Sequence, residues 1–241
     1  GSFMKRRWLS VILAVCTAIS AIQIPIFAAE NSTDSATAGV TYTLSGENNQ
    51  ILTVSGTGEI TSLELNKTLS FDEKERVTSI IIDSGITGIA DDYNTLLTKV
   101  KKITLKGSGN FRFGNYAFRN LDSLSVESER DSIEVGSYTF QNTQLLQFPL
   151  DSIVKIKSFG FSNAQLPVEG KNLTLHFADN VDMSAKYPSN SIYQYALSGV
   201  KNSTGETFSS ADITISGTVA FGEIASNRSN IFGSSNSVTA L

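Results

Sequence analysis

The sequence predicts a mostly β protein that is built from stacked repeats. Three similar stretches carry this prediction: YAFRNL, YTFQNT and FGFSNA, which begin at Tyr116, Tyr138 and Phe159. Self-similarity at a period of about 20–30 residues is typical of stacked repeat architectures. Short strand-like runs recur at a similar interval, and no stretch keeps an apolar stripe of helical period. We therefore expect a coiled β structure and not a sandwich.

The first 29 residues predict export. Residues 1–3 precede a methionine and are interpreted as an expression scar. Residues 4–29 combine a basic start, an uncharged run and an Ala-rich end, which is the pattern of a cleaved signal peptide. A membrane anchor is the alternative, because the uncharged run approaches the ~20 residues that span a bilayer. A lipid anchor at Cys16 is disfavoured because Val15, just before it, is not small.

The charge balance argues against a nucleic-acid partner. The signal peptide holds three of the 19 basic residues and no acidic residue, so 16 basic residues face 23 acidic ones, a net charge of −7. Binding to phosphates needs clustered lysine and arginine. The only cysteine leaves with the signal peptide, so no disulfide framework is expected and stability must come from a buried core.

The rest of the chain divides into a linker, a cap and a repeat region. Residues 30–39 are small and polar, as in a flexible linker. Residues 40–70 form a predicted β-hairpin cap, because TYTLSGENNQILTVSG alternates apolar and polar residues around an Asn-rich turn. Ser70, followed by acidic residues, could begin a short helix. Residues 71–241 form the predicted repeat region, which becomes irregular after residue 166.

Two columns of the repeat are expected to fill the core. Its large column is Phe118, Phe140 and Phe161, with spacings of 22 and 21 residues. The small column beside it is Ala117, Thr139 and Gly160, and Ala196 with Leu197 extends both. Stacked rings bury much apolar area, about 1.5–3 kcal/mol for each ring relative to exposure. On the preceding strands, inward positions with the same interval are Ile103, Leu124 and Leu146.

An asparagine column repeats with the same spacing. It consists of Asn120, Asn142 and Asn163, each two places after a core phenylalanine. An asparagine side chain can donate to and accept from backbone groups in a tight turn. We expect these three side chains to be buried or half-buried and to be bonded to the backbone of a neighbouring repeat. An exposed row of ligand-binding asparagines is the alternative.

These patterns resemble a known family of repeats. The stretches VTSIIIDSGITGIADD at 77–92 and FGNYAFRNLDSLSV at 113–126 are similar to the treponemal-type leucine-rich repeats of BspA-like bacterial surface proteins. Ala117 and Phe118 match the family's A-F pair, and the resemblance covers about residues 40–200. It implies a right-handed leucine-rich-repeat solenoid with one parallel β-sheet. It also implies export, often with a role in adhesion or host-protein binding.

No constellation of residues predicts catalysis or a metal site. His176 is the only histidine, so a zinc site or a Ser-His-Asp triad would depend on one imidazole. Paired carboxylates could run glycoside hydrolysis without a histidine. The candidates are Asp91 with Asp92, and the group Glu127, Glu129 and Asp131, but charged turns are usually only solvated. We expect no enzyme, no metal and no cofactor.

The solvent face of the sheet is the predicted binding surface. Its outward positions, taken as one column of small polar side chains, are Thr104, Ser125, Gln147, Thr174 and Thr214. Repeat proteins often bind partners with such extended faces. The alternative is that threonine and serine simply suit an exposed strand.

These observations favour an exported, non-enzymatic interaction module. It would be a monomer, secreted or at the cell surface, and would touch a membrane only through its signal peptide. The expected partner is a host extracellular protein, a bacterial surface protein or a glycan. A structural spacer without a dedicated ligand is the alternative, and a carboxylate-based glycosidase is a third hypothesis.

Overall fold

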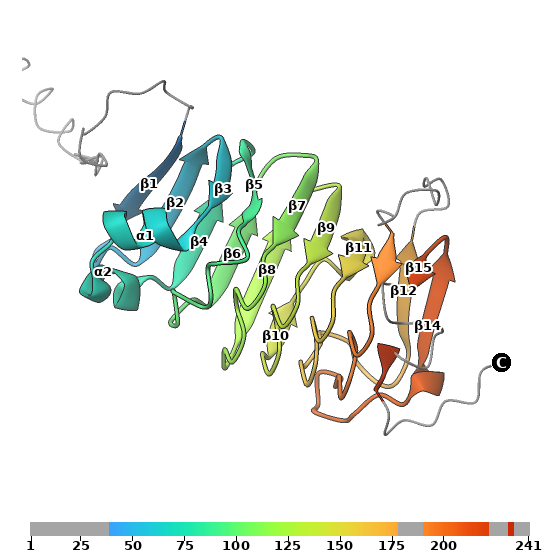
Figure 1. The fold of residues 1–241 in the computed structure, drawn as a ribbon. Coiled ribbons are helices and arrows are strands. Elements are labelled where there is room, and N and C mark those ends of the chain that lie inside the picture. The colour runs from blue at the N-terminus through green and yellow to red at the C-terminus, as the bar shows by residue number, and fades with distance from the viewer. Residues whose placement is uncertain (1–38, 178–189, 222–230, 234–241) are drawn as a thin grey trace, which may run out of the picture.

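The computed structural model describes residues 39–177, 190–221 and 231–233. The chain is mostly β, with parallel sheets and two short α-helices in this part, so the predicted fold class is confirmed at that level. Within each of the two larger sheets the strands follow one another in chain order along the molecule (Figure 1). The predicted expression scar, signal peptide and most of the linker lie outside the described residues.

The chain begins with the hairpin that the alternating pattern predicts. Strand β1 (Val40–Ser45) pairs antiparallel with β2 (Ile51–Gly56). The turn between them closes with a hydrogen bond of 3.3 Å from the backbone N–H of Asn49 to the carbonyl oxygen of Gly46. Leu52 and Val54 are buried, so one face of the hairpin covers the end of the core.

Two short helices follow strand β3 (Gly58–Ile60), and only the second was predicted. Helix α2 (Phe71–Arg76) begins with a capping box, in which Ser70 and Glu73 each bond the other's backbone N–H. Helix α1 (Ser62–Thr68) has no extended apolar stripe that would have revealed it in the sequence.

From residue 79 the chain passes back and forth between two sheets. The first sheet has the order β1-β2-β4-β6-β8-β10, and the second has the order β15-β13-β11-β9-β7-β5-β3. The first sheet continues with β4 (Ser79–Ile82), β6 (Lys102–Leu105), β8 (Leu124–Ser128) and β10 (Leu145–Gln147). The second sheet is completed by β5 (Ile86–Ile89), β7 (Asn110–Phe113), β9 (Ser132–Val135), β11 (Ile153–Ile156), β13 (Ser191–Ile192) and β15 (Ala220–Phe221).

The chain forms two long sheets, and not the one parallel β-sheet that the resemblance implied. The short apolar pieces NFRF, SIEV and IVKI form the strands β7, β9 and β11, which pair in parallel. Their alternate residues are buried, as in Phe111 and Phe113. Each passage as far as β11 therefore contributes one strand to each sheet, and the core lies between the two sheets.

The predicted irregularity after residue 166 is visible in the pairing. Strand β12 (Leu173–Phe177) pairs in parallel with β14 (Ile213–Gly217) as a separate two-stranded sheet. Two short 3-10 helices, η1 (Leu150–Ser152) and η2 (Ser210–Asp212), precede β11 and β14.

The predicted aromatic column is buried between the sheets. Phe118, Phe140 and Phe161 are at most 1% exposed. Their rings stack with centroid distances of 6.3 Å and 5.7 Å. Tyr93 lies 5.6 Å from Phe118 and extends the column in the passage that lacks a phenylalanine. Leu197 continues it at the other end, with 1% exposure.

The column is carried by four successive turns, which we call the aromatic turns: residues 114–121, 136–143, 157–164 and 193–200. Each aromatic turn leads away from a strand of the second sheet. Neighbouring turns are joined by backbone hydrogen bonds, such as those from Phe118 to Thr139 (2.9 Å) and from Phe140 to Gly160 (2.9 Å). This pairing satisfies backbone groups that would otherwise be orphaned beside the core.

Candidate functional site

The predicted binding column on the first sheet does not form one row. In the strand register Thr104 lies opposite Glu127, whereas Ser125 lies opposite Lys102 and Gln147. Thr104 and Ser125 are half-buried and Gln147 is exposed, so all three do point away from the core. They belong to two different rows, because the strands pair with an offset that the equal sequence spacing does not reveal.

The remaining two members of that column lie on another sheet. Thr174 of β12 is paired with Thr214 of β14, and both are exposed. The prediction of a single five-residue column is therefore wrong, because β12 and β14 do not join the first sheet.

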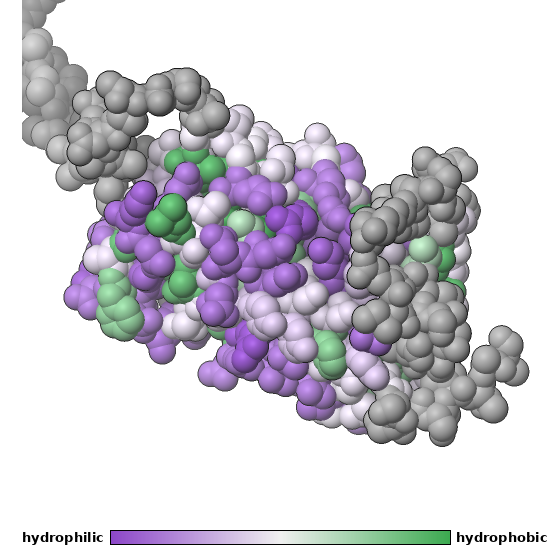
Figure 2. All heavy atoms as spheres, viewed as in Figure 1, coloured by the Kyte–Doolittle hydropathy of each residue, from purple (hydrophilic) through white to green (hydrophobic). Residues whose placement is uncertain are grey.

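The first sheet also lacks an apolar patch on its outer face. Lys102 and Glu127 form an exposed ion pair of 3.3 Å there. Leu146 is the only large hydrophobic side chain exposed on this sheet among the described residues, at 57%. It was predicted to point inward, but a register shift between β10 and β8 turns Leu145 into the core instead. The face seen in Figure 2 is mostly hydrophilic, with separate hydrophobic spots.

The asparagine column is exposed, which corrects the prediction that it is buried. Asn120, Asn142 and Asn163 all have exposed side chains and left-handed backbones, with φ of 61°, 57° and 56°. Asparagine is among the few residues that tolerate this conformation. Gly199, with φ of 66°, occupies the corresponding place in the fourth aromatic turn. The backbone N–H groups of the three asparagines bond to the backbone of the neighbouring turn, and the side-chain amide of Asn142 donates to the side-chain oxygen of Asn120 at 3.0 Å.

A second aromatic column, which we call the outer ladder, runs along the same edge. It consists of Tyr116, Tyr138, Phe159 and Tyr195, all half-buried. Successive ring centroids lie 5.0, 4.8 and 5.1 Å apart. Sequence reasoning did not assign this column a role, although the three similar stretches begin on its first three members. The repeated aromatic residue before the small core residue was the available signal.

Two hollows lie along the asparagine row, and together we call them the turn-edge groove. The first hollow has a volume of about 740 Å³ and is lined by Asp91, Asn94, Thr95, Thr98, Tyr116, Arg119, Asn120 and Leu121. The second has a volume of about 230 Å³ and is lined by Leu121, Asp122, Asn142, Thr143, Gln144, Asn163, Gln165 and Lys201. Leu121 borders both hollows, so they are neighbours on one edge of the molecule.

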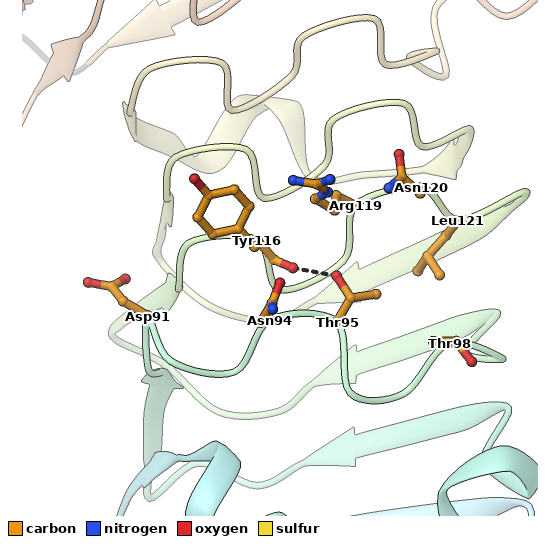
Figure 3. Close-up of a pocket in the computed structure, with 8 residues that line it drawn as sticks. All are labelled: Asp91, Asn94, Thr95, Thr98, Tyr116, Arg119, Asn120 and Leu121. Atoms are coloured by element: carbon orange, nitrogen blue, oxygen red, sulfur yellow. Dashed lines mark hydrogen bonds between the residues drawn. The ribbon is translucent and has the colours of Figure 1, made fainter.

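The first hollow lies between two successive passages of the chain (Figure 3). Asp91 marks one end of it and Thr98 marks the other. Between them, the guanidinium carbon of Arg119 lies 5.3 Å from the centroid of the Tyr116 ring. The hydroxyl of Thr95 donates a hydrogen bond to the carbonyl oxygen of Tyr116, which ties the two walls together.

The carboxylate of Asp91 is already occupied by protein groups. It accepts hydrogen bonds from Arg112 (2.9 Å) and from the backbone N–H of Asn115 (3.0 Å). Arg112 also forms an ion pair of 3.2 Å with Glu59. Partial burial opposes the ionisation of Asp91, but the Asn115 N–H and the charge of Arg112 outweigh it and lower the pKa of the carboxyl.

The acidic candidates for catalysis serve as acceptors for nearby groups. Asp92 accepts a hydrogen bond from the hydroxyl of Ser62 (3.1 Å). Glu129 and Asp131 accept the backbone N–H groups of Gly107 and Gly109 at 3.0 Å and 2.8 Å. These bonds join loops of successive passages and do not bring two carboxylates to face each other.

The histidine is paired with one hydroxyl. The Nδ1 atom of His176 lies 2.8 Å from the hydroxyl oxygen of Ser216, on the neighbouring strands β12 and β14. Within the described residues no group of three potential metal ligands occurs. The acidic segment ADNVD, at 178–182, lies outside the described residues.

Comparison of the chain with protein-family models, with curated proteins and with solved structures found no match. Among the helices of the described residues, none has the length and apolar character that crossing a bilayer requires.

Proposed function

We propose that the chain is an exported bacterial leucine-rich-repeat protein of the BspA-like type, folded as a right-handed solenoid. The support is the alternation of the chain between two parallel sheets, together with the even spacing of Phe118, Phe140 and Phe161. In a solenoid, each repeat contacts only the repeats next to it.

The proposed function is non-enzymatic binding of a host or microbial macromolecule at or outside the bacterial surface, through the turn-edge groove. The observation that carries this proposal is the pair of hollows that share Leu121 along the exposed asparagine row. Ligand sites commonly have volumes of about 300–1,000 Å³, a range that includes the first hollow. Its lining of hydroxyl, amide and charged groups suits a polar ligand.

A spacer without a ligand is the second candidate. It is favoured by the outer face of the first sheet, where Leu146 is the single exposed large hydrophobic side chain among the described residues. Protein interfaces usually centre on a cluster of buried aromatic or apolar anchors, and this face offers none.

A binding array of extracellular matrix proteins, bacterial surface proteins and glycans separates the two candidates. We expect the mature chain to bind at least one member. A variant that combines Asn120→Gly, Asn142→Gly and Asn163→Gly removes three amides from the groove but suits the left-handed backbone, as Gly199 does. It should lose binding by about tenfold or more, since each polar contact contributes about 0.5–1.5 kcal/mol.

The matched control changes the sheet face instead. Ser125→Ala combined with Gln147→Ala should leave the affinity unchanged. If this control loses binding while the glycine variant does not, the groove is the wrong surface. If no member of the array binds, the spacer replaces the binding function.

Export has its own measurement. We expect the secreted protein to begin at Ala29 or Glu30, which N-terminal sequencing of the product from a bacterial culture medium or envelope would detect. Recovery of an intact residue 4–29 segment on the mature chain would support the membrane-anchor alternative.

A further inference from the structure

We propose that the first hollow binds a carboxylate-bearing sugar of a glycan, with Arg119 as the residue that receives the carboxylate. This inference rests on the proposed binding function, and it names the ligand class of the same groove.

Arg119 is the uncompensated charge of the hollow. It forms no ion pair or hydrogen bond within the part of the chain that the structure describes, and its side chain is half-buried against Tyr116. The nearest carboxylate in the lining, that of Asp91, is held by Arg112 and Asn115. An arginine presents its N–H groups as a planar fork that fits a carboxylate with two parallel hydrogen bonds.

Tyr116 supplies an apolar surface beside that fork. It is the first member of the outer ladder, with Tyr138 stacked on it at 5.0 Å. The preceding passage has no aromatic residue at the matching place. The side chain of Asp91 accepts a hydrogen bond from the backbone N–H of Asn115, and the side chain of Asn115 accepts the same bond from Ser137. Asp91 therefore corresponds to Asn115, and the next residue, Asp92, corresponds to Tyr116. The ladder therefore ends at the hollow, and the Tyr116 ring lines it.

The rest of the lining matches the hydroxyl groups of a sugar. Asn94 makes no side-chain hydrogen bond within the described residues, and the amide nitrogen of Asn120 is also without an acceptor there. The hydroxyls of Thr95 and Thr98 donate to Tyr116 and Glu75, and their oxygens remain able to accept. A polyhydroxylated ring can use donors and acceptors of both kinds.

The charge balance favours one carboxylate and not a polyanion. Removal of the predicted signal peptide leaves 16 basic and 23 acidic residues. This net negative charge repels ligands that carry many negative charges. Among the described residues that line the hollow, only Arg119 carries a positive charge. An acidic peptide could also reach this charge, but it would use fewer of the hydroxyl and amide groups around it.

Isothermal titration of the full mature chain tests the proposal. The probes are 3′-sialyllactose with lactose as its neutral counterpart, and the monosaccharide galacturonate with its methyl ester. A triglutamate peptide is the third arm. We expect at least one acidic sugar to bind about tenfold or more tightly than its neutral counterpart, as for a charge-assisted hydrogen bond.

Three variants locate the binding. Arg119→Gln should weaken the acidic sugar about tenfold or more, to the level of the neutral one, and Arg119→Lys should restore part of the loss because it keeps the charge without the fork. Lys171→Gln makes the same change in net charge on an exposed side chain before β12 and should change nothing. Thermal unfolding of each variant checks that the fold is intact.

Several results would overturn the proposal: no binding of either acidic sugar, equal binding of the neutral counterparts, an unchanged affinity in Arg119→Gln, or a triglutamate affinity equal to that of the sugars. These results leave the proposed binding function in place if another array member binds through the groove. Both proposals fail if no array member binds, or if binding is lost in the sheet-face control but not in the glycine variant.

Discussion

At the scale of single residues, backbone conformation explains why asparagine recurs. Asn120, Asn142 and Asn163 are placed where the chain turns with positive φ, a conformation that asparagine adopts with less strain than most other residues. Their exposure follows, because the turn directs the side chain outward while the backbone N–H bonds the next turn. The hydrogen bond of 3.0 Å from Asn142 to Asn120 links two members of the row.

A pair of substitutions separates backbone strain from loss of the amide. Asn142→Ala should reduce the free energy of unfolding by about 1–2 kcal/mol, because alanine resists the left-handed conformation. Asn142→Gly should lose less, because glycine adopts it freely. Urea denaturation of both variants measures the difference, and an alanine variant at least as stable as the glycine variant would contradict this explanation.

The ion network at Asp91 predicts a pH dependence. The pKa of Asp91 is lowered in the folded chain, so its ionised form stabilises the fold above the pKa of the unfolded chain. That contribution is lost as the pH falls through the folded pKa, that is, below about 4. Because the group is exposed, the effect should be under about 1 kcal/mol.

Asp91→Asn is the matched variant for this effect. Asn115 shows that an asparagine oxygen can accept the equivalent N–H, at 2.8 Å from the nitrogen of Ser137. The variant should therefore keep that bond and unfold with less dependence on pH. Thermal unfolding between about pH 6 and 2 measures this, and an identical pH profile in both proteins would assign the dependence to other groups.

Residue-level prediction succeeded where one chemical property decides the outcome. The burial of Phe118, Phe140 and Phe161 follows from their size and even spacing. The exposure of the asparagines was not predicted, because asparagine has two properties that suit a turn. Its side chain can bond backbone groups, which favours burial, and its backbone tolerates positive φ, which is the property used here. A buried asparagine that bonds backbone and an exposed asparagine at positive φ would repeat with the same spacing, so the sequence alone could not distinguish them.

At the scale of secondary-structure elements, Arg130 connects three passages of the chain. It is 4% exposed, and its guanidinium donates to the carbonyl oxygens of Lys106 (2.7 Å), Asp83 (2.9 Å) and Ile86 (2.8 Å). Its guanidinium carbon also lies 5.2 Å from the centroid of the Phe111 ring. Burial lowers the pKa of this arginine, because no carboxylate within the described residues compensates the charge.

Removal of this link should destabilise the fold. Arg130→Met keeps much of the apolar volume but removes the guanidinium donor from three carbonyl groups, of which that of Asp83 keeps a backbone donor, the N–H of Ile86. We therefore expect a loss of about 2–4 kcal/mol. Arg130→Lys retains the charge and should lose less. Chemical denaturation measures both, and a methionine variant as stable as the parent would mean that water replaces the guanidinium without cost.

The core column gives the second prediction at this scale. Phe140→Ala should cost about 3–5 kcal/mol, because it opens a cavity between two stacked rings. Phe140→Leu should cost less than half of that, since Leu197 already occupies the same column. Equilibrium unfolding of the two variants is the measurement. A loss of unfolding free energy near zero in the alanine variant would contradict the burial of this ring in the core.

Elements were predictable where the sequence pattern is local. The hairpin of β1 and β2 and the capping box at Ser70 follow from alternation and from one residue pair. The second sheet was missed because a short apolar run does not reveal whether it pairs with a neighbour. The exchange of Leu145 for Leu146 arises from a register shift, and a slip of one residue reverses the face of a side chain.

At the scale of the whole molecule, the stacked passages create the turn-edge groove. Three successive aromatic turns place an asparagine and an aromatic side chain on the same edge, so lateral pairing converts a sequence repeat into a surface. The first hollow depends on the place where this regularity fails, at Asp91 and Asn94. The sequence shows that this passage lacks a phenylalanine, but the hollow follows from how the passages stack.

Hydrogen–deuterium exchange of the full mature chain, with and without the array member it binds, tests the binding surface most directly. Binding in the turn-edge groove predicts slower exchange in residues 91–98, 116–121 and 141–144, with little change in β6 and β8. Protection confined to the strands of the first sheet, with the groove unchanged, would contradict it.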